Sequence, residues 1–140
     1  MRVLVCGGRD FDLDDVVLTT LDRLDAKSFI GVVIHGGASG ADALANAWAK
    51  KRDVQTIVYP ADWRKSGKAA GPLRNERMLR ESRPDIVVAF PGGKGTTDMV
   101  RRAMAAGTSV VQVSREGVVR GAASRLFAPL RGDRSGSAKR

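Results

Sequence analysis

Short runs of consecutive apolar residues alternate along this chain with longer stretches in which apolar residues recur at helical spacing. The runs are rich in Val and Ile, whose branched side chains favour strands. A run that is apolar at every position, instead of every second one, is typical of a strand buried on both faces. The runs predict strands over residues 3–6, 30–34, 54–59, 86–90 and 109–113.

The stretches between the runs have the apolar spacing of amphipathic helices. Asp12 or Asp14 is expected to cap the first helix, and Pro72 is expected to be the first residue of the third. Residues 62–70 have no apolar period and are expected to form a loop. Helices are predicted over residues 15–26, 39–51, 72–82 and 97–106.

Strands and helices that alternate with short connections are typical of a parallel sheet covered on both faces. We therefore predict an α/β fold, a Rossmann-like doubly wound parallel sheet, in a single domain over residues 1–130. Residues 131–140 are basic and poor in apolar side chains, and we expect a disordered tail there. In such sheets ligands bind outside the carboxyl ends of the strands, near the switch point of the strand order.

Three glycine-rich turns follow predicted strands and would meet at that edge of the sheet. Glycine has no Cβ, so backbone N–H groups in such a turn can approach an anion closely. We predict a site for a phosphate-bearing ligand, formed in the first turn by Gly7, Gly8, Arg9 and Asp10, in the second by Gly36, Gly37, Ser39 and Gly40, and in the third by Pro91, Gly92, Gly93, Lys94, Gly95, Thr96 and Thr97.

The third turn, FPGGKGTT, is the most specific of the three. It joins a buried strand to a helix, whose N-terminus adds free N–H donors and a partial positive charge. It matches neither the P-loop pattern GxxxxGKS/T nor GxGxxG. Thr96 and Thr97 can cap the helix or donate their hydroxyls to a phosphate. The alternative is a tight strand-to-helix turn that binds no ligand.

The first two turns contain charged residues with alternative roles. Arg9 can clamp a phosphate through two N–H groups, or pair with Asp10 to order the loop. Ser39 is a candidate N-cap, while Asp42 can bind a ribose hydroxyl, bind a neighbouring loop or cap its helix. His35, the only histidine, is expected to be structural.

Further candidates lie before and within the third predicted helix. Arg74 and Asn75 are neighbours, so they cannot both face the core, and at least one should reach toward the site. Glu76 stands near the start of the helix, where an acidic residue is ordinary. Trp63 and Tyr59 offer aromatic surface on which a base could stack, although core packing is expected for Tyr59.

The chain carries a net charge of +9 and has a pI near 10.6. Basic residues gather in the segment from Arg64 to Arg83 and again after Arg115. A basic balance favours phosphate-bearing partners, either nucleotides or nucleic acid, although a solvated basic face would give the same charge.

The composition also excludes several classes of protein. The single cysteine, Cys6, rules out an internal disulfide and is expected to pack as an apolar residue. No cluster of ligating side chains has metal spacing, so we predict no metal site and no cofactor. No apolar run reaches the length of a membrane span, and the chain opens on a strand pattern instead of a signal peptide. We expect a cytoplasmic protein with no membrane partner.

Four motifs occur in the order GGRDF, HGGASGAD, WRKSGKAAGPLRNERM and PDIVVAFPGGKGT. In these motifs, over roughly residues 1–113, the chain resembles the YspA-like branch of the SLOG superfamily. That superfamily includes the LOG phosphoribohydrolases, the DNA-processing protein DprA and molybdenum-cofactor carriers. The resemblance implies a Rossmann-like fold, a nucleotide or nucleotide-derived ligand at the glycine turns, and a polar set of Arg9, Asp10, Asp42, Arg74, Asn75 and Glu76.

The LOG enzymes release a free base from a nucleoside monophosphate, and their motif is similar to PGGxGTxxE, whose last Glu is catalytic. Residues 91–96 match its first part, but Met99 stands at the Glu position. Asp98 is one residue early, about 100° away around the helix. The resemblance therefore implies phosphate binding and leaves LOG-type acid–base chemistry without its residue.

Three functions follow as hypotheses. The first is nucleotide-ligand binding by a sensor or carrier. The second is a nucleotide N-glycosidase that uses Asp42, Glu76 or Asp98 as its catalytic carboxylate, because a carboxylate stabilises positive charge developing on the ribose. The third is nucleic-acid binding like that of DprA, which rests on the net charge. The resemblance also implies a homodimer paired through helices.

Overall fold

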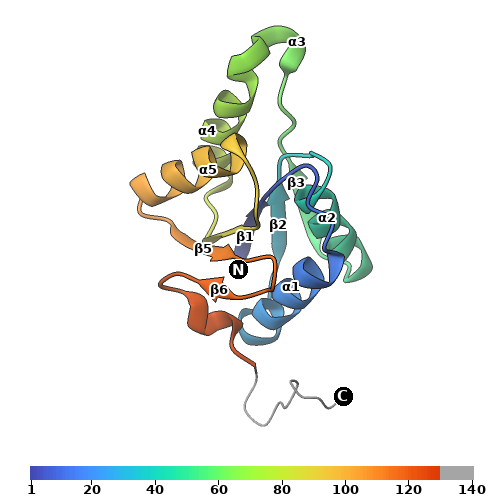
Figure 1. Cartoon of the computed structure of the whole chain (residues 1–140). Helices are drawn as coiled ribbons and strands as arrows, with labels where there is room; N and C mark the ends of the chain where they lie inside the picture. The colour runs from blue at the N-terminus through green and yellow to red at the C-terminus, as the bar shows by residue number, and fades with distance from the viewer. Residues whose placement is uncertain (130–140) are drawn as a thin grey trace.

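The computed structural model describes residues 1–129, which form a six-stranded sheet covered by helices on both faces (Figure 1). The strand order is β3-β2-β1-β4-β5-β6. Neighbours from β3 through β5 pair in parallel, and β6 pairs antiparallel with β5. The predicted Rossmann-like α/β class is therefore confirmed. The strands are β1 (Arg2–Cys6), β2 (Val32–His35), β3 (Gln55–Val58), β4 (Ile86–Ala89), β5 (Ser109–Val113) and β6 (Val119–Arg120).

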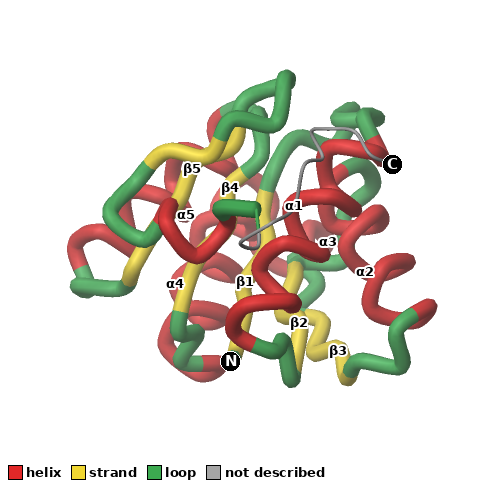
Figure 2. Tube along the Cα trace, turned by 90° about the horizontal axis from the view of Figure 1, so that it is seen from below, coloured by secondary structure: helices red, strands yellow, loops and turns green. Residues whose placement is uncertain are grey.

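The helices form two layers, one on each face of the sheet (Figures 1 and 2). One layer contains α1 (Asp14–Ser28), α2 (Ala41–Lys51) and the short 3₁₀ helix η2 (Ser124–Phe127). The other layer contains α4 (Ala70–Ser82) and α5 (Lys94–Ala105). None of the helices in residues 1–129 is long and apolar enough to cross a membrane.

The central strand β1 explains why the apolar runs are continuous. Val3 and Val5 pack into the layer of α1 and α2, while Leu4 and Cys6 pack into the layer of α4 and α5. All four side chains are buried, because successive residues of a strand point to opposite faces and both faces are covered.

The segment 62–70, which the sequence predicts to be a loop, is helical, and that prediction is wrong. It forms α3 (Trp63–Ser66) and the 3₁₀ helix η1 (Gly67–Ala69), which rise above the edge of the sheet in Figure 1. The Asp62 side chain caps α3 by accepting a hydrogen bond from the Lys65 N–H at 3.1 Å. Since α4 begins at Ala70, Pro72 is its third residue, not its first.

Other helix starts also differ from the sequence prediction. The N-cap of α1 is Leu13, without a side-chain cap, so neither Asp12 nor Asp14 has that role. The N-cap of α5 is Gly93, and the helix begins three residues earlier than predicted. Strand β6 and η2 were not predicted. The predicted tail, 131–140, lies outside the described residues.

The three glycine turns pack against one another where β1 lies between β2 and β4, which is the switch point of the strand order. The Gly8 N–H donates to the Pro91 carbonyl at 2.8 Å, and the Gly8 carbonyl accepts from the Ala41 N–H at 3.1 Å. Gly40 has φ +73° and ψ −128°, and a Cβ on it would collide with the Gly8 carbonyl oxygen. Glycine at position 40 is therefore required by both backbone conformation and space.

We predict that Gly40→Ala lowers the free energy of unfolding by about 2–4 kcal/mol, because positive-φ strain of about 1–3 kcal/mol adds to the clash with the Gly8 carbonyl. Gly107→Ala is the matched control, since Gly107 has φ +77° but open space around its Cβ position. The Gly107→Ala variant should lose only the free energy of unfolding that corresponds to the positive-φ strain. Urea unfolding measures both variants, and equal losses would show that the turns are packed too loosely to register the clash.

Candidate ligand-binding site

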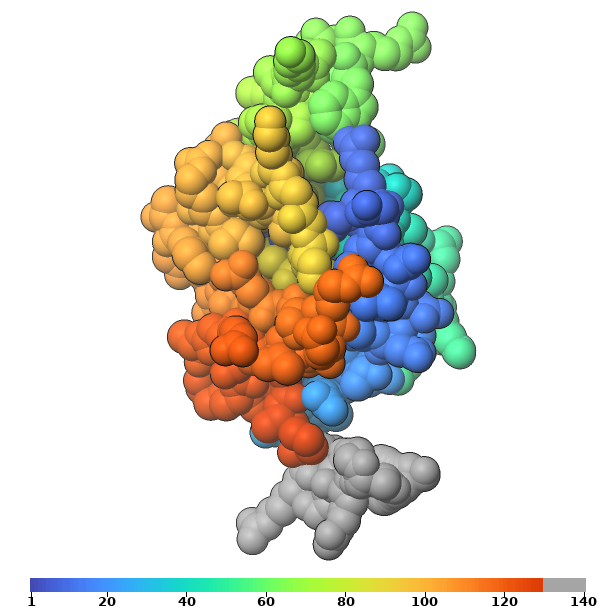
Figure 3. All heavy atoms as spheres, in the orientation of Figure 1, coloured from blue at the N-terminus to red at the C-terminus, as the bar shows by residue number. Residues whose placement is uncertain are grey.

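A cavity of about 690 Å³ opens at the carboxyl ends of β1 and β4, beside the switch point. In Figure 3 its mouth lies between the dark blue first turn and the yellow third turn, with the green α3 segment above. Most of the predicted site residues line it, namely Gly7, Gly8, Arg9, Asp10, Asp42, Arg74, Asn75, Gly93, Lys94, Gly95 and Thr96.

The third turn presents the open N-terminus of α5 to this cavity. The first backbone bond of the helix runs from the Thr97 N–H to the Gly93 carbonyl at 3.0 Å. Within residues 1–129 no acceptor binds the N–H groups of Lys94, Gly95 or Thr96. A Cβ built on Gly93 or Gly95 would meet no atom within 4 Å, so the wall is open here. These free donors and the helix dipole favour an anion.

The second turn differs, because three of its N–H groups, those of Gly36, Gly37 and Ala38, are already bonded within the protein. The Asp42 carboxylate accepts from Gly36 at 3.1 Å and from Ala38 at 3.2 Å. The Gly37 N–H donates to Nδ1 of His35 at 3.0 Å. Of the roles open to Asp42, the structure thus places its carboxylate on the neighbouring loop.

His35 is a structural residue in this arrangement. Because its Nδ1 accepts the Gly37 N–H, its Nε2 carries the proton and donates to Oδ1 of Asn46 at 2.9 Å. Both ring nitrogens are therefore occupied, and the side chain is buried.

Burial raises the pKa of Asp42, while its hydrogen bonds from Ala38 and Gly36 and the charge of Arg74 oppose that rise. Burial also raises the pKa of Cys6 to about 12, with a smaller contribution from Asp42. The Cys6 thiol therefore lines the cavity in its neutral form and acts as an apolar surface.

Arg74 and Asn75 connect α4 to the loops around the cavity. Arg74 donates from Nη1 to the carbonyls of Gly36 at 2.9 Å and Tyr59 at 3.2 Å, and from Nε to Asn75 Oδ1 at 3.0 Å. The Asn75 amide donates to the Gly95 carbonyl at 3.0 Å. Both side chains reach the site, as the sequence suggested for at least one of them.

Asp98 lies in the cavity wall, whereas Met99 is fully buried in the core of the α4 and α5 layer. The Asp98 carboxylate accepts hydrogen bonds from Asn75 at 3.0 Å, Arg102 at 2.8 Å and Arg101 at 2.7 Å. Burial alone would raise its pKa, but these bonds and the charge of Arg102 lower it below the ordinary value. The carboxylate is thus held in its ionised form.

Arg9 stacks on an aromatic ring instead of pairing with Asp10. Its guanidinium carbon lies 5.1 Å from the centroid of the Trp63 ring, a cation–π distance. No ion pair joins Arg9 and Asp10 among the described residues. Ser39 is not an N-cap, because Gly40 has that position, and its hydroxyl donates to the Arg9 carbonyl at 2.9 Å.

Several predicted site residues lie elsewhere. Gly36, Gly37 and Ser39 line a smaller neighbouring chamber, and Gly40 serves the packing of the turns. Pro91, Gly92 and Thr97 line a separate hollow of about 290 Å³, which Thr96 also borders. Glu76 borders a groove between α4 and α5 and pairs with Arg80 at 2.5 Å. The structure does not bring Glu76 to the cavity, because one residue advances about 100° around the helix from Asn75.

The cavity also contains residues outside the predicted site, notably Lys68, Gly71 and Met78. Trp63, considered from sequence only as a stacking surface, lines the cavity with an exposed fraction of 48%. Lys68, Gly71 and Trp63 belong to the WRKSGKAAGP motif, so the signal that could have identified them was present in the sequence. It was obscured because this segment has no apolar period.

Fold and site together define a Rossmann-like domain with an open helix N-terminus in a cavity at its switch point. A sequence profile of the YspA, cpYpsA-related SLOG family matches residues 1–65. The Gene 61 protein of Mycobacterium phage D29 is 39% identical in an alignment of 118 residues, which covers 79% of this chain and 94% of that protein. The chain belongs to the YspA, cpYpsA-related SLOG family, as its motifs indicated.

Solved structures of low sequence identity share the fold. DprA from Streptococcus pneumoniae superimposes with a TM-score of 0.64 at 18% identity, over 90% of this chain and 52% of that one, so the chain spans about half of DprA. The structural-genomics target TM1055 superimposes with a TM-score of 0.60 at 23% identity, over 79% of this chain and 72% of that one. The Moco carrier protein from Chlamydomonas reinhardtii superimposes with a TM-score of 0.51 at 16% identity, over 84% of this chain and 80% of that one.

We predict that Asp98→Asn lowers the free energy of unfolding at pH 7 by about 1–3 kcal/mol, because charged hydrogen bonds to Asn75 and Arg102 are lost. The folded pKa of Asp98 lies below its ordinary value of 3.8, so this stability is present above that value and is lost as the pH falls through the folded pKa. The difference from the wild type should therefore shrink below about pH 4.

Denaturant unfolding at a series of pH values measures this difference. Asp12→Asn is the control, since Asp12 is exposed and its carboxylate has no hydrogen-bond partner among the described residues. If the free energies of unfolding of Asp98→Asn and the wild type differ by the same amount down to pH 2, the stabilising bonds do not depend on the ionised carboxylate.

Proposed function

We propose that this protein binds a nucleotide or nucleotide-derived ligand in the cavity at the switch point, as a sensor or carrier. The observation that carries the proposal is the free N-terminus of α5. Its unbonded N–H groups at Lys94, Gly95 and Thr96 face a cavity whose wall is open at Gly93 and Gly95. A phosphoryl group fits this chemistry, since it accepts several N–H bonds and is favoured by the helix dipole.

The remainder of the cavity suits the less polar part of such a ligand. Cys6, Met78 and Pro72 give apolar wall, and Trp63 offers a flat aromatic face to a base. A volume of about 690 Å³ lies within the usual range for small-molecule sites. Membership of the SLOG family supports the same class of ligand.

Two of the cavity carboxylates already accept hydrogen bonds within the protein, which favours ligand binding without turnover. Asp98 is held by three donors, and Asp42 is buried, with its carboxylate bonded to the second turn. Met99, at the position of the catalytic Glu in the LOG motif, faces the core. A general base needs an accessible lone pair near the ribose, which these two carboxylates offer poorly.

We predict that Gly95→Asp weakens nucleotide binding about tenfold or more, because it adds a negative charge beside the free N–H groups. The same change should leave the protein as stable or slightly more so. Glycine is a poor helix residue, and an acidic side chain in the first turn is favoured by the dipole. Calorimetric titration with a panel of mononucleotides, together with thermal unfolding, measures both effects.

Gly31→Asp is the matched control for this experiment. Gly31 precedes β2 at the opposite end of the sheet, has no positive φ, and its Cβ would touch only Met1 at 3.9 Å. It should bind nucleotides as the wild type does. Undiminished binding by Gly95→Asp would mean that the N-terminus of α5 is not the anion site.

A nucleotide N-glycosidase is the second candidate, because a third carboxylate in the cavity has no partner. Asp10 is exposed and its side chain accepts no hydrogen bond within residues 1–129. A carboxylate in that position can stabilise the positive charge that develops on a ribose as its base departs.

Under the binding proposal, we expect no free base when the protein is incubated with mononucleotides and dinucleotides and the products are separated by chromatography. Base release that is abolished by Asp10→Asn, and retained by the exposed control Asp12→Asn, would establish the glycosidase instead. Asp42→Asn and Asp98→Asn test the two other cavity carboxylates in the same assay.

A further inference from the structure

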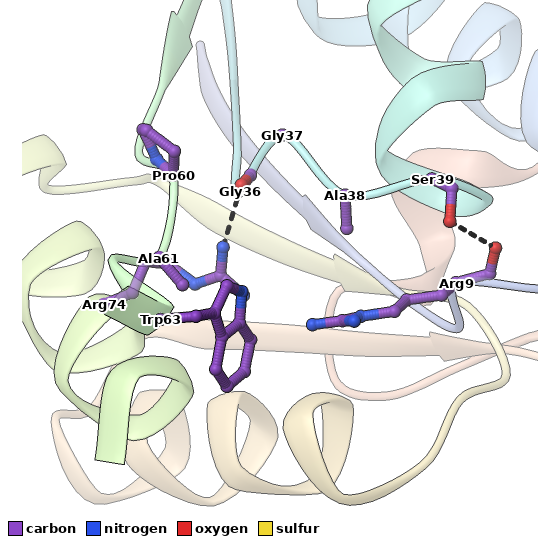
Figure 4. Close-up of a pocket in the computed structure, with 9 residues that line it drawn as sticks. All are labelled: Arg9, Gly36, Gly37, Ala38, Ser39, Pro60, Ala61, Trp63 and Arg74. Atoms are coloured by element: carbon purple, nitrogen blue, oxygen red, sulfur yellow. Dashed lines mark hydrogen bonds between the residues drawn. The ribbon is translucent and has the colours of Figure 1, made fainter. Parts of the chain in front are cut away.

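A smaller chamber of about 210 Å³ adjoins the main cavity (Figure 4). It lies between the second glycine turn and the segment that leads from β3 to α3, and it shares Arg9, Ala38, Trp63 and Arg74 with the main cavity. The two spaces are therefore adjacent, and these four residues border both of them.

Two arginines from distant parts of the chain line this chamber, and no carboxylate does. Arg9 reaches in from the first turn and Arg74 from α4, as Figure 4 shows. Asp42, whose charge acts on Arg74, lines the main cavity and not the chamber. Burial lowers the pKa of Arg74; Asp42 opposes this and the charge of Arg9 adds to it. Two guanidinium groups thus face one small space without an acid to neutralise them there.

Both arginines retain donors that point to no protein acceptor. Arg74 uses Nε and Nη1 to hold Asn75, Gly36 and Tyr59, while its Nη2 has no partner among residues 1–129. The Arg9 side chain donates no hydrogen bond in the same part of the chain. Its position comes from stacking on Trp63, and a stacked guanidinium keeps its in-plane N–H groups free for an anion.

The chamber and the N-terminus of α5 are formed by different residues. None of the nine residues that line the chamber belongs to the third turn or to α5. One phosphoryl group seated on the N–H groups of Lys94 and Gly95 therefore leaves the chamber unfilled. A second anionic group on the same ligand would fill it and would neutralise the two arginines.

We propose that the arginine chamber binds a second phosphoryl group, so that the ligand of this protein is a nucleotide with two phosphoryl groups instead of one. This rests on the proposed function, which supplies the first phosphoryl site at α5. The two groups are borne either next to each other, as in a nucleoside diphosphate, or on different ribose positions, as in a nucleoside 3′,5′-bisphosphate.

The test compares nucleotides that differ only in their second phosphoryl group. For each common base, the 5′-monophosphate, the 5′-diphosphate and the 3′,5′-bisphosphate are titrated calorimetrically into the full chain. At least one of the two doubly phosphorylated forms should bind about tenfold or more tightly than the monophosphate, which corresponds to about 1.4 kcal/mol. The form that shows the gain identifies which arrangement of phosphates spans the two sites.

Arg9→Gln assigns the gain to the chamber. Arg9 is exposed and its side chain donates no hydrogen bond to another element, so the variant should fold normally, whereas replacing Arg74 would release the loops that it holds. Within the variant, the affinity for the doubly phosphorylated form should exceed the affinity for the monophosphate by no more than about twofold, so that most of the gain from the second phosphate is lost. Arg64→Gln is the control, since Arg64 is exposed in α3 and lines neither space.

Two results would overturn the proposal while the proposed function stands. They are equal affinity for all three forms of every base, or a gain that Arg9→Gln leaves intact. If no nucleotide binds in any form, or if Gly95→Asp binds them all as the wild type does, the proposed function fails and the second phosphoryl site fails with it.

Discussion

One residue, Gly8, ties the three glycine turns together through its backbone N–H and its carbonyl. Its N–H donates to Pro91 in the third turn, and its carbonyl accepts from Ala41 at the start of α2. Because β1 lies between β2 and β4, only the turn after β1 is in a position to touch both others. A Cβ on Gly8 would lie 3.0 Å from the Pro91 carbonyl oxygen, which leaves room for little beyond glycine. The walls of the cavity are therefore set by this contact.

The glycines of the turns consequently serve two purposes. Gly8, Gly40 and Gly92 let one loop approach another, since a Cβ on any of them would crowd a neighbouring turn. Gly93 and Gly95 face open space, so there the absence of a side chain exposes N–H groups to the cavity. A sequence cannot distinguish these purposes, because both require a residue without a Cβ. The sequence therefore predicts the same role for the second turn, where Asp42 accepts hydrogen bonds from two of the N–H groups.

The sheet and its order of elements could be predicted because every strand residue of β1, β2 and β4 that packs in the core is apolar, apart from His35. The short helix α3 could not, since it buries no residue and so leaves no apolar period. The first turn of α5 was missed because it contains Gly95, and glycine has low helix propensity. Strand β6, with two residues, is too short to produce a pattern.

The position of Asp98 links the architecture to the choice between binding and turnover. A carboxylate one residue later, at Met99, would have to enter a fully buried apolar layer of α4, α5 and the sheet. At Asp98 it instead accepts from Asn75, which also holds the Gly95 carbonyl. The carboxylate thereby fixes the N-terminus of α5 against α4, with its donors turned to the cavity. Two arginines also keep this carboxylate ionised. A carboxylate that is bonded in this way is poorly suited to exchange protons with a substrate.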